Sequence, residues 1–128
     1  MNDDRGNARD VDQFILHYVD SVPHLEALLL LWRTRPRHWS AVELATALYL
    51  QPRETESIAQ DLVRADLIAA LPEGYSYSSD DAEKDGLISA VDAAYKRETV
   101  RLSTLIHSRG SRAVRDFAQS FRLKKKEQ

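Results

Sequence analysis

The side chains best suited to chemistry lie in residues 53–66, and the chemistry they suit is contact with nucleic acid. Arg53 and Arg64 can pair with phosphates, and Ser57 and Gln60 can hydrogen-bond to base edges. These residues fall on a predicted helix, and an α-helix is an element that fits the major groove of B-DNA. We therefore predict that they contact DNA.

Acidic side chains accompany these groups and oppose the same chemistry. Residues 53–66 have a net charge of −2, because four carboxylates outnumber the two arginines. Acidic groups on an approach surface weaken phosphate binding directly. For DNA binding, Glu54, Glu56 and Asp61 must point away from the duplex. The alternative is that the helix still packs into the core of the domain but no longer binds in a DNA groove.

A second group of cations precedes this segment, at residues 33–37. A two-fold dimer that brings these arginines alongside Arg53 would restore a positive face. We add Arg37 and the nearby Ser40 to the candidate DNA contacts.

Other chemistry finds little support in the sequence. Without cysteine there is no thiolate nucleophile, disulfide or Cys-based zinc site, and the four histidines lack metal-ligand spacing. The sequence has no glycine-rich phosphate loop, nucleophile elbow or pair of carboxylates in an apolar setting. We expect no enzyme activity, no metal and no cofactor.

Charge divides the chain into an acidic body and a basic end. Residues 1–95 have a net charge of −9 and residues 96–128 one of +7, so the total of −2 conceals the asymmetry. The basic end could hold phosphates or dock on an acidic protein partner. Alternatively, it closes against the acidic body of its own or a neighbouring chain. Its cations include Arg109, Arg112, Arg115, Arg122 and Lys124 to Lys126.

Length and composition favour one cytoplasmic domain. A chain of 128 residues with 43% apolar side chains supports one core. The acidic N-terminus is unlike a signal peptide, and the longest apolar stretch, residues 25–32, is far shorter than the ~20 residues of a membrane span. We read residues 1–10 as a disordered tail and residues 11–128 as one domain, with a core at 22–78 and C-terminal helices at 82–121.

Periodicity and capping signals locate the elements that must position these residues. Apolar spacing predicts helices over 11–22 and 24–33, and the second is apolar nearly all round, as in a helix buried within a fold. Asp20 or Ser21 can cap it. Ser40 and Glu43 form a capping box before a helix at 41–50, and a further helix covers about 53–65.

A hairpin and a long helix complete the chain. Pro72, Glu73 and Gly74 form the turn of a hairpin at 67–78, whose Tyr75 and Tyr77 we expect to pack on the body. Residues 82–107 predict a long helix, and Ser111 can cap a last short one. The apolar stripes of this long helix and of the first helix present more surface than one small core covers, so we predict a homodimer. Alternatively, the two helices pack on each other within one chain. Its predicted interface residues are Phe14, Tyr18, Leu87, Val91, Tyr95, Leu102 and Ile106.

The order of elements resembles a winged helix-turn-helix with an extra N-terminal helix and a long C-terminal helix, a mainly α fold. Residues 39–48, with Ser40, Glu43, Leu44 and Ala45, and residues 58–68, ending in Leu67 and Ile68, look like segments of the MarR and PadR groups of bacterial regulators. One departure is Asp66, where the usual residue is glycine, although aspartate tolerates the left-handed conformation. The chain also resembles small uncharacterised proteobacterial winged-helix proteins.

This resemblance implies a DNA-binding transcriptional regulator that dimerises through its terminal helices. The alternative is a protein-interaction adaptor on a winged-helix scaffold that has lost DNA binding, since one fold can serve unrelated functions.

Overall fold

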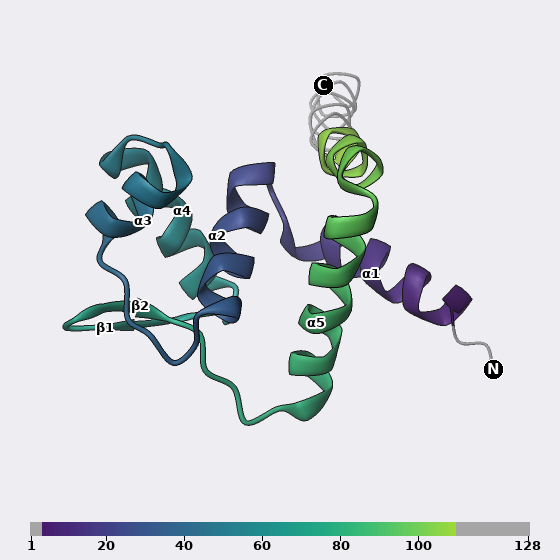
Figure 1. The fold of residues 1–128 in the computed structure, drawn as a ribbon, viewed down its shortest axis with the longest axis horizontal. Coiled ribbons are helices and arrows are strands. Elements are labelled where there is room, and N and C mark those ends of the chain that lie inside the picture. Colours follow the sequence, from purple (N-terminus) through teal and green to yellow (C-terminus); the bar gives the residue numbers. More distant parts are fainter. Residues whose placement is uncertain (1–3, 110–128) are drawn as a thin grey trace, which may run out of the picture.

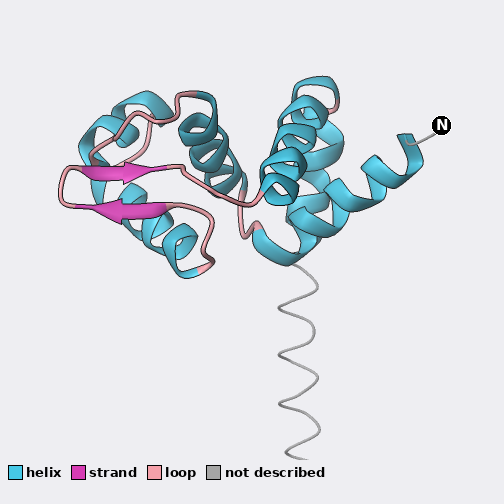
Figure 2. Cartoon of the chain, turned by 90° about the horizontal axis from the view of Figure 1, so that it is seen from below, coloured by secondary structure: helices cyan, strands magenta, loops and turns pink. Residues whose placement is uncertain are grey.

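The computed structural model describes residues 4–109, and of residues 4–7 only the backbone. It contains six helical segments and one antiparallel hairpin, which confirms the predicted mainly α winged helix (Figures 1 and 2). Figure 1 shows α2 between a lobe of α3, α4 and the hairpin and a second lobe of α1 and α5. The elements are α1 (Asp4–Tyr18), α2 (Val22–Arg33), α3 (Ala41–Leu48), α4 (Pro52–Arg64), β1 (Ala69–Leu71), β2 (Gly74–Ser76) and α5 (Ala82–Arg97), followed by helical residues 99–109.

Helix α2 is the centre of the core, as its apolar sequence predicted. Leu25, Leu28, Leu29 and Leu31 have no exposed surface, and the helix packs against α3, α4, α5 and β2. Ser21 caps it by accepting a hydrogen bond from the His24 backbone N–H at 3.3 Å. Because α2 is apolar on several sides, elements from both lobes pack against it.

Helices α3 and α4 form the helix-turn-helix pair. The predicted capping box is present: the Glu43 N–H donates to Ser40 Oγ at 3.1 Å, and the Ser40 N–H donates to Glu43 Oε1 at 2.9 Å. Tyr49 ends α3 in the left-handed conformation, with φ 59°. Asp66 takes the left-handed conformation that its sequence position required, with φ 63°.

The hairpin is the wing, and the loop between α2 and α3 extends it. In the hairpin, Ala69 pairs with Ser76 and Leu71 with Gly74. Trp39 adds a short antiparallel bridge to Tyr75, with backbone N to O distances of 2.8 and 2.7 Å. The wing is therefore tied to the start of the helix-turn-helix by backbone hydrogen bonds.

Helix α1 differs from its predicted bounds. It begins at Asp4, within the segment read as a tail, and ends at Tyr18 rather than near Val22. Once Val11, Phe14 and Ile15 are buried, each additional residue extends the helix at little cost, because propagation adds one hydrogen bond per residue fixed. The cap at Ser21 then begins α2 at Val22.

A sharp turn separates α1 from α2. The chain bends by 114° between Ala8–Tyr18 and Val22–Arg33. Among residues 4–109 no single helix is long and apolar enough to cross a membrane, although these two segments together meet the length and composition of a broken span.

The long helix predicted over 82–107 is interrupted once. Helix α5 ends at Arg97; Glu98 has φ −133° and ψ 49°, and a new helical segment follows from residue 99. The Thr99 hydroxyl bonds to the Tyr95 carbonyl at 2.6 Å, and the β-branched pair Thr99 and Val100 lowers helix propensity there. After the break, Leu102 and Ile106 are buried in the same core as Val91. The predicted last helix, with Val114, Phe117, Ala118 and Phe121, lies outside the described residues.

We predict that Gly74 tolerates no side chain. Its φ is +138°, and an added Cβ would lie 2.4 Å from the Trp39 carbonyl oxygen. Gly74→Ala should therefore lower the free energy of unfolding by about 3 kcal/mol, measured by urea denaturation. Gly86→Ala is the matched control: it has open space in α5 and should stabilise by about 0.5–1 kcal/mol. Equal effects of the two substitutions would contradict this account of the wing.

Candidate nucleic-acid interface

One exposed stripe runs along the outer side of α4. At about 100° per residue, Arg53, Ser57, Gln60 and Arg64 lie within roughly 60° of one another around the helix. All four are exposed, and the opposite side is buried against the core. The structure thus brings four of the six predicted DNA contacts onto one outward face. The buried residues opposite are Thr55, Ile58, Ala59 and Leu62.

The acidic residues of α4 flank this stripe. Glu54 and Glu56 are exposed on either side of it. Asp61 is turned toward α2, where its Oδ2 lies 2.8 Å from His24 Nε2, and its Oδ1 pairs with Arg64. Two of the three carboxylates that needed to point elsewhere are therefore beside the stripe, and the third is bound by neighbours.

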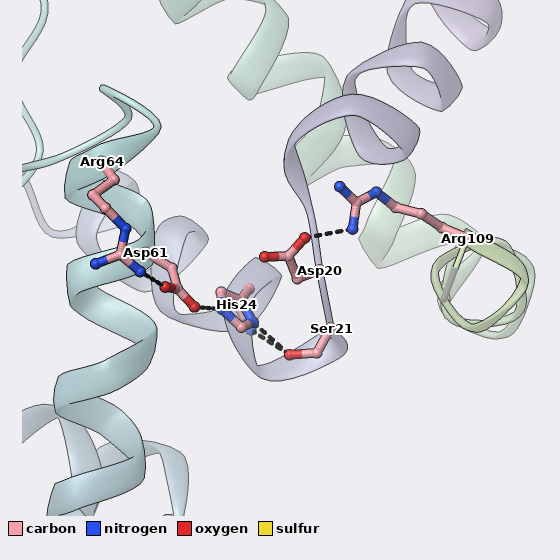
Figure 3. A network of polar contacts seen from close by, with 6 residues as sticks. All are labelled: Asp20, Ser21, His24, Asp61, Arg64 and Arg109. Carbon is pink, nitrogen blue, oxygen red and sulfur yellow. Dashed lines mark hydrogen bonds and ion pairs between the residues drawn. The ribbon is translucent and has the colours of Figure 1, made fainter. Parts of the chain in front are cut away.

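His24 connects α4 to the start of α2, as Figure 3 shows. It is 9% exposed; its Nδ1 lies 2.6 Å from Ser21 Oγ and its Nε2 contacts Asp61. The contact fixes the C-terminal half of α4 on the central helix. Ser21, His24 and Asp61 are the residue types of a hydrolytic triad. Here, however, Ser21 Oγ accepts a hydrogen bond from the His24 backbone N–H, so the observed role of Ser21 is to cap α2.

This network could not be predicted from the sequence, because His24 and Asp61 are far apart in the chain. The available signal was a histidine in the first turn of the most apolar helix, where a buried imidazole needs a polar partner. Asp20 lies on the other side of His24, and the ligand atoms of Asp20, His24 and Asp61 are all within 4.8 Å of one another. These three could hold a metal ion, but Arg109 already pairs with Asp20 and Arg64 with Asp61.

Ser40 and Arg37 differ from the other predicted contacts. The Ser40 hydroxyl is engaged in the capping box, so its observed role is to start α3. Arg37 is exposed in the loop before α3, where its guanidinium stacks on the Trp39 ring at 3.6 Å. Arg35 stacks similarly on Trp32, at 4.4 Å.

The wing tyrosines pack on the body, as predicted. Tyr77 is 2% exposed, and Tyr75 is half-buried against the core. Glu73 is at the turn, so the wing offers no cation at its tip. Contacts from this wing to a minor groove would lack the usual arginine or lysine.

Four of the seven predicted dimer-interface residues are covered within one chain. Phe14, Val91, Leu102 and Ile106 are at most 4% exposed, because α1 packs against α5 and the segment after it. Tyr18 remains exposed, and Leu87 and Tyr95 are half-buried. The Tyr95 hydroxyl donates to Glu26 at 3.1 Å; burial, followed by this hydrogen bond, raises its pKa.

Of the basic C-terminal end, the structure describes cations only as far as Arg109. Its guanidinium pairs with Asp20 and donates to the Leu16 carbonyl at 2.6 Å, which holds the helical segment 99–109 against the end of α1. Arg112, Arg115, Arg122 and Lys124 to Lys126 lie outside the described residues.

Comparison with known proteins identifies the fold. No protein-family model and no curated protein matches the sequence. Among solved structures, the chain is similar to MepR, a transcription regulator of the Staphylococcus aureus multidrug efflux pump MepA, with a TM-score of 0.54 and 13% identity over 97% of this chain and 92% of that one. The chain therefore shares the winged-helix fold of MepR. A MarR family protein of Mycobacterium tuberculosis, Rv2887, aligns over 97% of this chain and 87% of its own with 15% identity and a TM-score of 0.49.

We predict that His24 and Asp61 of this winged helix are energetically coupled. His24→Ala and Asp61→Ala should each lower the free energy of unfolding by about 1–3 kcal/mol, because each removes a hydrogen bond from a partly buried partner. The double variant should lose at least about 0.5 kcal/mol less than the sum, measured by urea unfolding. Arg64→Ala, whose side chain is 69% exposed, should cost less than about 0.5 kcal/mol. Additive losses would show that the contact does not fix α4.

Proposed function

We propose that this winged helix binds duplex DNA through α4 and acts as a transcription regulator. The observation that carries the proposal is the outward stripe of Arg53, Ser57, Gln60 and Arg64, opposite the buried side of α4. Such a stripe offers cations for phosphates and hydrogen-bonding groups for base edges. The likeness in fold to MepR, which is a transcription regulator, supports the proposal.

Electrostatics determine how strong this binding can be. Asp61 is occupied by His24 and Arg64, which reduces its repulsion of a phosphate, whereas Glu54 and Glu56 are exposed beside the stripe. Arg35 and Arg37 add cations in the loop before α3. We therefore expect weak non-specific binding, so that affinity for a specific site depends strongly on base contacts.

The experiment is a salt titration of binding to random duplex DNA. Replacing Arg53 and Arg64 with alanine should weaken binding to all sequences and reduce the slope of log K against log salt by about 0.9 per lost phosphate contact. Replacing Glu54 and Glu56 with glutamine should strengthen non-specific binding. The matched control removes two exposed arginines from α1 and α5, Arg9 and Arg97, and should leave the slope nearly unchanged.

Two outcomes would change the assignment. If the wild-type chain shows no salt-dependent association at low ionic strength, the regulator proposal fails, and the adaptor function, with the exposed side of α4 as a protein-docking surface, replaces it. If deleting residues 122–128 alone abolishes binding, the contact lies in the basic end, and α4 is not the reading element.

We propose further that the chain forms a homodimer through the groove between α1 and α5. The groove has a volume of about 730 Å³; Phe14, Tyr18 and Leu87 line it, with Asp10 and Glu83 among its acidic groups. A second copy suits this surface, because its residues 96–128 have a net charge of +7. A two-fold arrangement lets each copy supply both the groove and the basic end.

Sedimentation should accordingly show a dimer at micromolar concentration. Tyr18→Glu places a charge in the apolar part of the groove and should shift the equilibrium to monomer. Val42→Glu is the matched control, since Val42 is also an exposed apolar residue but lies on α3. A monomeric wild-type chain, or equal effects of the two substitutions, would contradict the proposed interface.

A further inference from the structure

Three side chains that can bind a metal ion lie together where α4 meets the segment between α1 and α2. Asp20 is in that segment, His24 is in the first turn of α2, and Asp61 is on α4. One ligand atom of each lies within 4.8 Å of the other two. Figure 3 shows the His24 ring between the two carboxylates. Spacing along the chain could not reveal this group, because each ligand comes from a different element.

These donors suit a divalent transition-metal ion. Zn²⁺ binds imidazole nitrogen and carboxylate oxygen, and three protein ligands leave its fourth position to water. Its bonds of about 2.0–2.2 Å keep the ligand atoms of a tetrahedral site roughly 3.4 Å apart. His24 Nε2 and Asp61 Oδ2 are 2.8 Å apart, and Asp20 is exposed, so small side-chain movements are enough to close the three ligands around an ion.

Ser21 orients the His24 ring as a metal site requires. Its Oγ lies 2.6 Å from Nδ1, so Nε2 is the ring nitrogen that faces Asp61. When a metal binds one nitrogen of an imidazole, the other carries the proton and needs an acceptor, and the Ser21 hydroxyl can be that acceptor. His24 is only 9% exposed. Its ring is therefore ordered before an ion arrives, which lowers the cost of binding.

The charges around the group supply a second argument for a divalent ion. The two carboxylates carry two negative charges, and two guanidiniums balance them: Arg109 pairs with Asp20, and Arg64 pairs with Asp61. A divalent cation brings the same positive charge to the centre of the group, so it can replace both arginines without leaving a carboxylate uncompensated. The Arg64 side chain is 69% exposed, and an ion pair at the surface holds such a side chain only weakly.

We propose that Asp20, His24 and Asp61 bind Zn²⁺, and that the ion displaces Arg109 and Arg64 from the two carboxylates. The bound ion links α4 to the segment before α2 through Asp20 as well as through His24. Arg64 is then released on the exposed stripe of α4, where it can pair with a phosphate. Zn²⁺ should therefore strengthen DNA binding; this consequence, unlike the site itself, rests on the proposed function.

The first test is a calorimetric titration of the full chain, without an affinity tag, with Zn²⁺ alone. One ion should bind per chain, and Mg²⁺ should not compete, because it prefers six oxygen ligands. Asp20→Asn and His24→Gln should each weaken Zn²⁺ binding by at least about tenfold. Asp80→Asn and His38→Gln are the matched controls: they change exposed residues of the same types away from the group and should leave the affinity unchanged.

Arg64→Ala distinguishes a metal site from ion pairs that only hold the fold together. The substitution removes a competitor of the ion, so the affinity for Zn²⁺ should rise by about twofold, which is the scale of an exposed ion pair. A lower affinity in this variant would contradict the displacement of Arg64 by the ion.

DNA binding with and without Zn²⁺ tests the consequence for α4. Zn²⁺ should strengthen binding of the wild-type chain to random duplex DNA, and the gain should be smaller in Arg64→Ala, which still binds the ion. If Zn²⁺ binds and the DNA affinity stays the same, the regulatory step is overturned. If the chain binds Zn²⁺ but no DNA with or without it, the proposed function fails and the metal site stands.

The site itself is overturned if Zn²⁺ does not bind the wild-type chain, or if Asp20→Asn and His24→Gln bind it as tightly as the wild type does. If His24→Gln does not fold, Asp20→Asn decides alone, because the Asp20 side chain is 53% exposed and lies outside the core.

Discussion

The leucines of α2 must be covered on every side, and the rest of the fold follows from that constraint. Leu25, Leu28, Leu29 and Leu31 are fully buried, which requires α3 and α4 together with β2 from one lobe and α5 from the other. Burial of this kind is non-directional, so it holds the elements together without fixing how each one is rotated. Polar contacts at the ends of α2 supply that direction. His24 orients α4 through Asp61 at one end, and Arg33 contacts Asp92 of α5 at 2.7 Å at the other.

Local signals in the sequence were sufficient for most of the fold. Ser40 with Glu43 fixed the start of α3, Asp66 permitted a left-handed turn without glycine, and Pro72 to Gly74 located the hairpin. Each of these signals acts within a few residues, which is why it is readable without tertiary information. The break at Glu98 could not be predicted from the sequence. The low helix propensity of Thr99 and Val100 allows a break there, but the break forms because it lets Leu102 and Ile106 pack into the core.

Partners distant in the sequence explain the rest of what was missed. Apolar periodicity correctly found the stripe of Val91, Leu102 and Ile106, but periodicity does not distinguish burial within a chain from burial against a second one. Similarly, the net charge of −2 for residues 53–66 treats Asp61 as a free anion, whereas it is held between His24 and Arg64. Composition gives the net charge of a segment, but only the fold shows which of its charges are free of partners and can act on a ligand.

An arginine that stacks on an aromatic ring keeps more of its positive charge available than an arginine that pairs with a carboxylate. Arg64 is paired with Asp61, so a phosphate that approaches it must compete with an anion already present. Arg37 lies on the Trp39 ring instead, and its carboxylate neighbour, Glu43, is 4.0 Å away on an exposed side chain. A ring orders a guanidinium through its quadrupole and leaves the full positive charge directed at solvent. Trp39 is itself fixed, because its indole N–H donates to Thr34 Oγ1 at 2.9 Å and its backbone pairs with Tyr75 of the wing. The loop before α3 therefore presents an ordered cation whose charge is largely available, whereas the charges of α4 partly cancel one another.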